Sequence, residues 1–166
     1  MNKKIIISDA SPLIALARIK HLSLLSQTLG DIIIPEAVAA ECILDALKPG
    51  AREIKQAIDK QMIEVHKDPP LHTYQKWSVI LGQGESAAII LAKTLKSALF
   101  IDEKLARQVA FTLNLQVIGT AGLLLLAKQK GELPQVKPLL TALKKEGYYL
   151  SAALEKEVLL RANEHL

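Results

Sequence analysis

Acidic residues recur in this sequence at the ends of apolar runs and in the helical segments that adjoin them. The residues concerned are Asp9, Glu41, Glu85 and Asp102. Carboxylate oxygens are the ligands that Mg²⁺ prefers, and carboxylates crowded together without a cation repel one another. The set is therefore interpreted as a candidate metal site rather than as a general acid–base pair. Two such ions, about 3.5–4 Å apart, can hold the attacking and leaving oxygens of a phosphodiester.

Each of these acids also has an ordinary structural explanation. Asp9 could be a solvated strand end, and Glu41 could lie on a solvated helix face. Glu85, in a first helical turn, would complement the helix dipole, and Asp102 could cap the helix that follows it. Their common placement at strand ends and adjoining helices favours one shared site over four separate explanations.

The elements that must position the acids alternate between strand and helix. Apolar runs predict strands at 5–7, 31–34, 62–66, 98–101 and 115–118, with 62–66 at an edge. Helices are expected at 21–29, 35–47, 52–60, 103–113, 121–130, 134–146 and 151–163, besides one that Ser11 caps and one that follows Gly82. Residues 68–82 are expected to form a loop.

This alternation predicts a three-layer α/β/α fold with a central, mostly parallel sheet. Parallel strands end at the same edge of a sheet, which is where open α/β folds bind their ligands. Asp9 and Asp102 each follow a predicted strand, so both are expected at that edge. With 166 residues, the chain is expected to form one domain over 1–166, with 132–166 as a helical C-terminal extension.

Composition narrows the function classes. Half of the residues are apolar, which argues against disorder, and the net charge of +4 permits a polyanionic partner. The few aromatic residues argue against a module built from several base-stacking platforms. The lone Cys42 excludes an internal disulfide and argues against a zinc site with thiolate ligands.

The N-terminal segment resembles a signal peptide only in part. Lys3 and Lys4 precede an apolar run, but Asp9 and Pro12 interrupt what should be a continuous apolar core. No stretch approaches the roughly 20 apolar residues of a membrane span. We therefore expect a cytoplasmic protein without a membrane partner.

Several further residues are secondary candidates. Ser11 could orient Asp9 or a metal-bound water, and Glu103 adds a charge beside Asp102. Lys104 and Arg107 could contact phosphate, although most such charges are only solvated. The segment 119–122, Gly-Thr-Ala-Gly, follows a strand but lacks the lysine of a phosphate-binding loop, so it is interpreted as a turn.

The segment 6–14, Ile-Ile-Ser-Asp-Ala-Ser-Pro-Leu-Ile, resembles the opening strand and turn of PIN domains, the small metal-dependent nucleases of many toxin–antitoxin pairs. Glu41 matches the helical glutamate of that family, Glu85 within Gly-Gln-Gly-Glu-Ser-Ala-Ala-Ile matches its third acid, and Asp102 matches the acid after its fourth strand. The tail, with 136–140 and 147–151, resembles a little-characterised prokaryotic PIN-like branch.

The resemblance implies a ribonuclease that uses Mg²⁺ or Mn²⁺ to hydrolyse RNA phosphodiesters. Asp9 and Asp102 would be the principal metal ligands, and Glu41 and Glu85 would complete the set directly or through water. It also implies the toxin of a toxin–antitoxin pair, with RNA as substrate, a small antitoxin as partner and a homodimer as the assembly.

Two other functions stay open at this point. The chain could be a catalytically weak or inactive PIN-like module that binds nucleic acid or protein. It could also be a small-molecule phosphohydrolase in which Asp9 is the nucleophile, which would form a phospho-aspartate.

Overall fold

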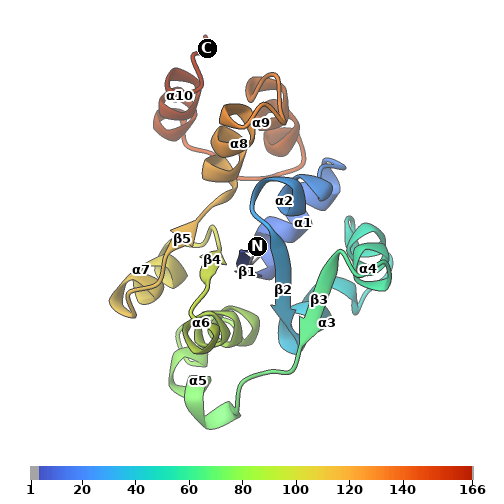
Figure 1. Ribbon diagram of the computed structural model, residues 1–166, viewed down its shortest axis with the longest axis vertical. Coiled ribbons are helices and arrows are strands. Elements are labelled where there is room, and N and C mark those ends of the chain that lie inside the picture. Colours follow the sequence, from blue (N-terminus) through green and yellow to red (C-terminus); the bar gives the residue numbers. More distant parts are fainter. Residues whose placement is uncertain (1–3, 166) are drawn as a thin grey trace.

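The computed structural model describes residues 4–165, and the strands among them form one parallel sheet (Figure 1). Their spatial order is β3-β2-β1-β4-β5. The bounds are β1 (Ile5–Ser8), β2 (Asp31–Pro35), β3 (Ile63–His66), β4 (Ala98–Phe100) and β5 (Val117–Ile118). The predicted α/β fold is thus confirmed, with β3 at an edge as expected. The described residues leave out 1–3 and 166. The predicted domain includes all four of these positions, and the signal-like segment includes 1–3.

The sheet lies between two layers of helices. Their bounds are α1 (Ala10–Arg18), α2 (Ser23–Thr28), α3 (Glu36–Ile43), α4 (Ala51–Asp59), α5 (Leu71–Ser78), α6 (Gln83–Leu95), α7 (Lys104–Thr112), α8 (Thr120–Gln129), α9 (Lys137–Lys145) and α10 (Ala152–Arg161). Helices α3 and α6 contact the central strands, and α5 packs on the outside of α6.

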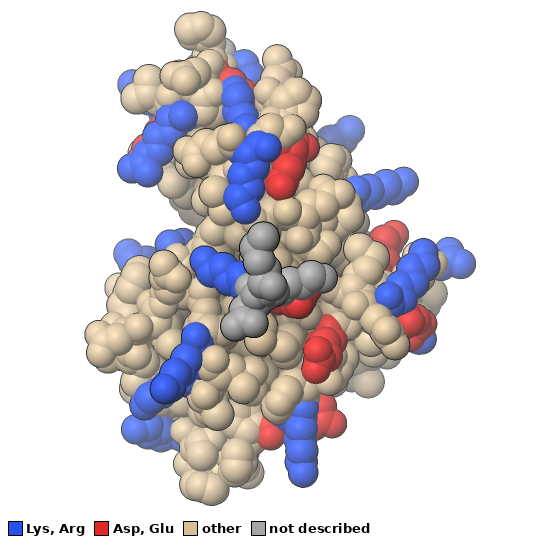
Figure 2. Space-filling view, in the orientation of Figure 1, with Lys and Arg blue, Asp and Glu red and all other residues tan. Residues whose placement is uncertain are grey.

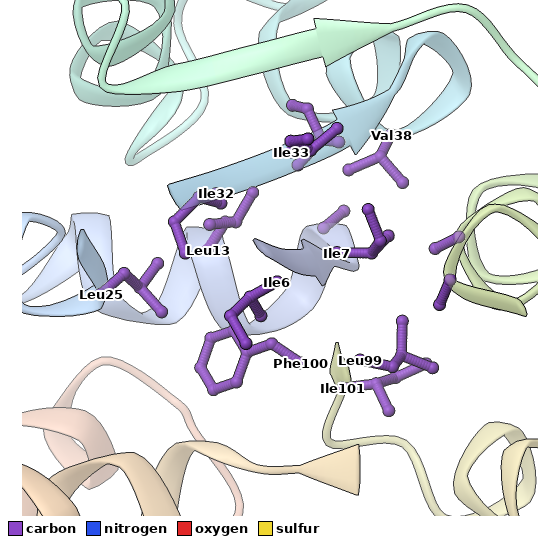
Figure 3. Packing of buried hydrophobic residues seen from close by; sticks show 14 of the residues in the cluster. Ile6, Ile7, Leu13, Leu25, Ile32, Ile33, Val38, Leu99, Phe100 and Ile101 are labelled. Carbon is purple, nitrogen blue, oxygen red and sulfur yellow. The ribbon is translucent and has the colours of Figure 1, made fainter. Parts of the chain in front are cut away.

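Alternating strand residues divide the core between the two faces of the sheet, because successive side chains of a strand point in opposite directions. In Figure 3, Ile6 and Phe100 lie toward Leu13 and Leu25, which come from α1 and α2. Ile7 and Leu99 lie on the other side, with Val38 of α3. Both faces are apolar because both are covered, which is why these strands read as continuous apolar runs.

The segment expected to be a loop contains a helix. Helix α5 follows Pro70, and its Tyr74 is only 3% exposed, packed with Ala87 and Ile90 of α6. The sequence of this helix is largely polar, so its apolar periodicity is weak. Packing against α6 therefore stabilises a helix that local pattern did not predict.

The first helix begins earlier than predicted. It starts at Ala10, so Asp9, with extended backbone, occupies the position before the helix that was assigned to Ser11. Pro12 then lies inside the first turn, where a missing N–H breaks no helical hydrogen bond. The predicted cap at Ser151 is confirmed, since its side chain accepts a hydrogen bond from the Leu154 backbone N–H.

The C-terminal helices share a second apolar cluster with α1 and α2. Ala15 and Leu24 pack there with Leu124 of α8 and with residues of α9 and α10. Glu164 adds polar ties, because its carboxylate accepts hydrogen bonds from Lys128 and from the backbone at the start of α9. The division of the chain into a single domain with an extension at 132–166 stays a prediction.

Within residues 4–165, the helices are all too short or too polar to cross a bilayer.

We predict that the C-terminal helices depend on Leu124, which is fully buried in the second cluster. The Leu124→Ala variant should lose about 2–5 kcal/mol of unfolding free energy, because truncation leaves a cavity. Chemical denaturation followed by circular dichroism measures this loss. The control is Leu160→Ala on α10, where the leucine is 72% exposed and its truncation should change stability little. Equal effects of the two substitutions would contradict the described packing.

Candidate metal centre

Asp9 and Asp102 leave the same edge of the sheet from neighbouring strands. Strands β1 and β4 are paired in parallel, with Ser8 opposite Phe100. The pairing continues one step further, since the Asp9 backbone N–H donates to the Phe100 carbonyl oxygen at 3.0 Å. Asp102 follows two residues after that carbonyl. The structure therefore brings these two predicted site residues to one place.

Glu41 and Glu85 reach this place from helices α3 and α6, which contact each other. Gly84 lies directly beside the Glu41 carboxylate, because a Cβ there would lie 2.8 Å from Glu41 Oε1 and 3.4 Å from Val38 Cγ2 and would displace the Glu41 side chain. The Glu41 carboxylate thus rests against the first turn of α6, the turn that carries Glu85. The absence of a side chain at Gly84 leaves room for the Glu41 carboxylate beside this turn.

Asp9 has the most unusual environment of the four acids. The residue is 1% exposed, and within the described part of the chain its Oδ1 atom has no hydrogen-bond partner. The pKa of Asp9 is raised to about 7, mainly by burial. The negative charges of Glu85, Glu41 and Asp102 contribute to this rise, and a backbone hydrogen bond from Ala10 opposes it. A buried carboxylate surrounded by like charge is a strong point of attraction for a cation.

The two glutamates show the same crowding. Burial raises the pKa of Glu85, and the charges of Glu103 and Glu41 add to the effect. Burial also raises the pKa of Glu41, while Lys48 acts in the opposite direction. Because perturbed carboxyl groups gathered in one place are typical of functional sites, these shifts support a shared site.

Thr120, which sequence reasoning did not select, holds Asp102. Its backbone N–H donates to Asp102 Oδ1 at 2.8 Å, and its hydroxyl donates to Oδ2 at 2.6 Å. Gly119 makes room for the contact, since a Cβ at that position would lie 2.9 Å from Asp102 Oδ1. The Gly-Thr pair after β5, interpreted from sequence as a turn, is the signal that could have indicated this role.

The helix-capping explanation for Asp102 does not apply. Glu103 caps α7 instead, accepting a hydrogen bond from the Ala106 backbone N–H at 2.7 Å. Asp102 does not cap α7; its carboxylate contacts Thr120 and lies at the edge of the sheet where the other acids lie.

The remaining candidates lie around this edge. Ser11 is exposed on the first turn of α1, and its side chain forms no hydrogen bond to any other residue between 4 and 165. Lys104 is exposed on α7. Arg107, one turn further on, lies across Gly119 from Asp102, because the position of a Gly119 Cβ would be 3.0 Å from Arg107 Nη1.

The donor chemistry fits a hard divalent cation. All four acids offer oxygen ligands, the type that Mg²⁺ and Mn²⁺ prefer, and Asp9 Oδ1 is unpartnered within the described residues. In the side-chain positions described for residues 4–165, no three His, Cys, Asp or Glu side chains form a group that could hold a metal ion. Coordination by three of them therefore requires side-chain movement.

Comparisons with known proteins give a family and a distant structural likeness. A family model described as a PIN domain matches residues 5–164. The crystal structure of PAE2754 from Pyrobaculum aerophilum is similar, with 17% sequence identity and a TM-score of 0.45, over 67% of this chain and 90% of that chain. Among curated proteins, none matches this sequence.

We predict that ionisation of Asp9 destabilises the fold. The pKa of Asp9 is about 7 when folded and 3.8 as the reference value, so the folded state binds its proton more tightly. The stability that the folded protein has with Asp9 protonated is fully present below about pH 4, and it is lost as the pH rises through about 7. The variant Asp9→Asn should therefore gain stability relative to the wild type across that range, by up to about 4 kcal/mol at pH 8.

Urea denaturation of both proteins at pH 4.5 and pH 8, in chelator, measures this difference. A difference in stability that does not change with pH would show that the Asp9 carboxyl is not perturbed.

We predict that Gly84→Ala displaces Glu41, because the added methyl group would lie 2.8 Å from Glu41 Oε1. The variant should bind Mn²⁺ about tenfold or more weakly in calorimetric titration, a loss typical of disturbed ligand surroundings. The matched control is Gly82→Ala, where the nearest atom to a Cβ is Glu85 Oε1 at an ordinary 3.7 Å. Unchanged Mn²⁺ binding by Gly84→Ala would exclude Glu41 from the metal site.

Proposed function

Because the chain belongs to the PIN-domain family, whose members are typically nucleases, we propose that it is a metal-dependent endoribonuclease. The observation that supports this most strongly is the buried Asp9 oxygen that has no hydrogen-bond partner within residues 4–165, at an edge of the sheet where three further acids add negative charge. Such a set is costly for the fold and is explained by a cation that it binds.

The proposed metal ligands are Asp9 and Asp102, with Glu41 and Glu85 completing the set directly or through water. A bound Mg²⁺ or Mn²⁺ supplies positive charge for the phosphodiester and lowers the pKa of a bound water. Asp9 contributes a rigidly placed oxygen, because it is fixed by the β1–β4 pairing on one side and by α1 on the other.

Thr120 acts as a positioning residue in this proposal. Its two hydrogen bonds fix the plane of the Asp102 carboxylate, and each carboxylate oxygen keeps a lone pair for a ligand bond. Arg107 and Lys104 on α7 line a cavity that Asp102 also lines, and both are proposed to bind a substrate phosphate. Within residues 4–165 neither forms an ion pair with a carboxylate, so both charges are available to an anion.

The finer parts of the proposal stay predictions. They are the role of toxin, the small antitoxin, the homodimer and the cytoplasmic location. The binding module without activity and the phosphohydrolase with Asp9 as nucleophile are the alternatives, and each differs from the nuclease in a measurable property.

We predict that purified protein cleaves fluorescently labelled RNA with Mn²⁺ or Mg²⁺ and that chelator abolishes the cleavage. Asp9→Asn and Asp102→Asn should each reduce the rate at least about a hundredfold, because loss of a ligand should exceed the loss known for outer-shell partners. Asp59→Asn is the control, since this exposed acid on α4 forms only a surface ion pair with Lys55.

Cleavage that resists chelator, or that Asp102→Asn leaves unchanged, would overturn the nuclease proposal. The binding module would be favoured if the wild type and both variants bind RNA with similar affinity but none of them cleaves it under conditions that support metal binding. A covalent phospho-aspartate formed with a small phosphate ester would favour the phosphohydrolase.

A further inference from the structure

A cavity of about 520 Å³ opens beside Asp102, on the side away from Asp9. One wall comes from α7, β5 and the start of α8, and the other from residues 148–161 of the C-terminal segment. In Figure 2 the outline of the molecule is notched at the left, between the part with α8–α10 and the part with the sheet, and Lys and Arg side chains lie on both sides of the notch.

The floor of this cavity is apolar. It is formed by aliphatic side chains from β5, α8 and α10: Val117, Ile118, Ala121, Leu125 and Val158. Two successive tyrosines, Tyr148 and Tyr149, line its edge. Tyr149 is 85% exposed, which leaves the face of its ring open to a ligand. An apolar floor with an open aromatic ring suits the flat, π-rich face of a nucleobase.

The cavity also has basic lining residues. Lys104 and Arg107 come from α7, on the same wall as Asp102, and Arg161, paired with Glu157, comes from α10 on the other wall. Arg107 and Tyr148 both line this cavity. Aromatic rings, cations and the proposed metal ligand Asp102 thus line one cavity, which brings together groups that can contact the base and the phosphate of a nucleotide.

The size of the cavity indicates which form of nucleic acid it can bind. Its volume is within the range of roughly 300–1,000 Å³ that pockets for small organic ligands have, which accommodates one nucleotide. A base can enter only if it is unpaired and unstacked, as in single-stranded regions and loops of RNA.

We propose that this cavity holds one unpaired nucleotide of a single-stranded RNA, next to the phosphate that is cleaved. The base lies on the apolar floor against Tyr149, and Arg107 and Lys104 bind its phosphate. This inference rests on the proposed nuclease function, of which it specifies the substrate class. Residues 148–161, which carry none of the proposed ligands, thereby take part in choosing the substrate.

The test measures RNA binding apart from cleavage, by fluorescence anisotropy of a fluorescein-labelled single-stranded RNA of mixed sequence. Full-length Asp9→Asn protein in chelator is the starting point, so that the probe stays intact. Adding Tyr149→Ala should weaken binding roughly tenfold, the typical loss of one base–aromatic stack. Tyr149→Trp should restore it, and the same RNA annealed to its complement should bind more weakly than the single strand.

Matched controls lie outside the cavity. Phe111→Ala removes another exposed aromatic ring, and Lys93→Gln removes another exposed cation for comparison with Arg107→Gln. These controls should leave RNA affinity unchanged, whereas Arg107→Gln should reduce it several-fold. Thermal unfolding should be the same for Tyr149→Ala and its parent, because the side chain is exposed.

The two proposals fail separately. Equal RNA binding by Tyr149→Ala and Phe111→Ala, equal binding of the duplex, or no RNA binding at all would overturn the nucleotide cavity, even if metal-dependent cleavage is observed. Cleavage that persists in Asp9→Asn would overturn the nuclease mechanism while leaving a Tyr149-dependent binding site intact.

Discussion

Repulsion among carboxylates gathered at one edge of the sheet is the constraint on which the site depends. Parallel pairing of β1 with β4 brings the ends of both strands together, and Asp9 and Asp102 follow those ends. Helices α3 and α6 add Glu41 and Glu85 from one side. The fold holds this charge in place through close backbone approaches at Gly84 and Gly119, where any side chain would collide with a carboxylate oxygen.

Asp9 and Asp102 differ in burial and in the hydrogen bonds that their carboxylates accept. Asp102 is half-buried, and each of its carboxylate oxygens accepts a hydrogen bond from Thr120. Asp9 is almost completely buried, and its pKa is raised mainly by that burial. The proposed cation would favour the ionised form of Asp9, which burial otherwise disfavours.

The strands and the acids could be predicted from sequence, whereas their neighbours could not. Parallel strands that are covered on both faces appear in the sequence as uninterrupted apolar runs, so β1, β2 and β4 could be predicted from such runs. The adjacency of β1 and β4, on which convergence rests, follows from tertiary pairing and has no local signature. Thr120 was missed because the Gly-Thr pair after β5 was interpreted only as a turn, and because its partner Asp102 lies 18 residues away in the chain. The functional roles of the acids remain predictions.

The far wall of the cavity beside Asp102 is built by the chain's last segment, whereas the acids come from the sheet and from α3 and α6. The proposed metal ligands and the proposed nucleotide-binding residues thus come largely from different stretches of sequence. If both proposals hold, substitutions within 148–161 would change substrate selectivity while leaving the metal ligands in place.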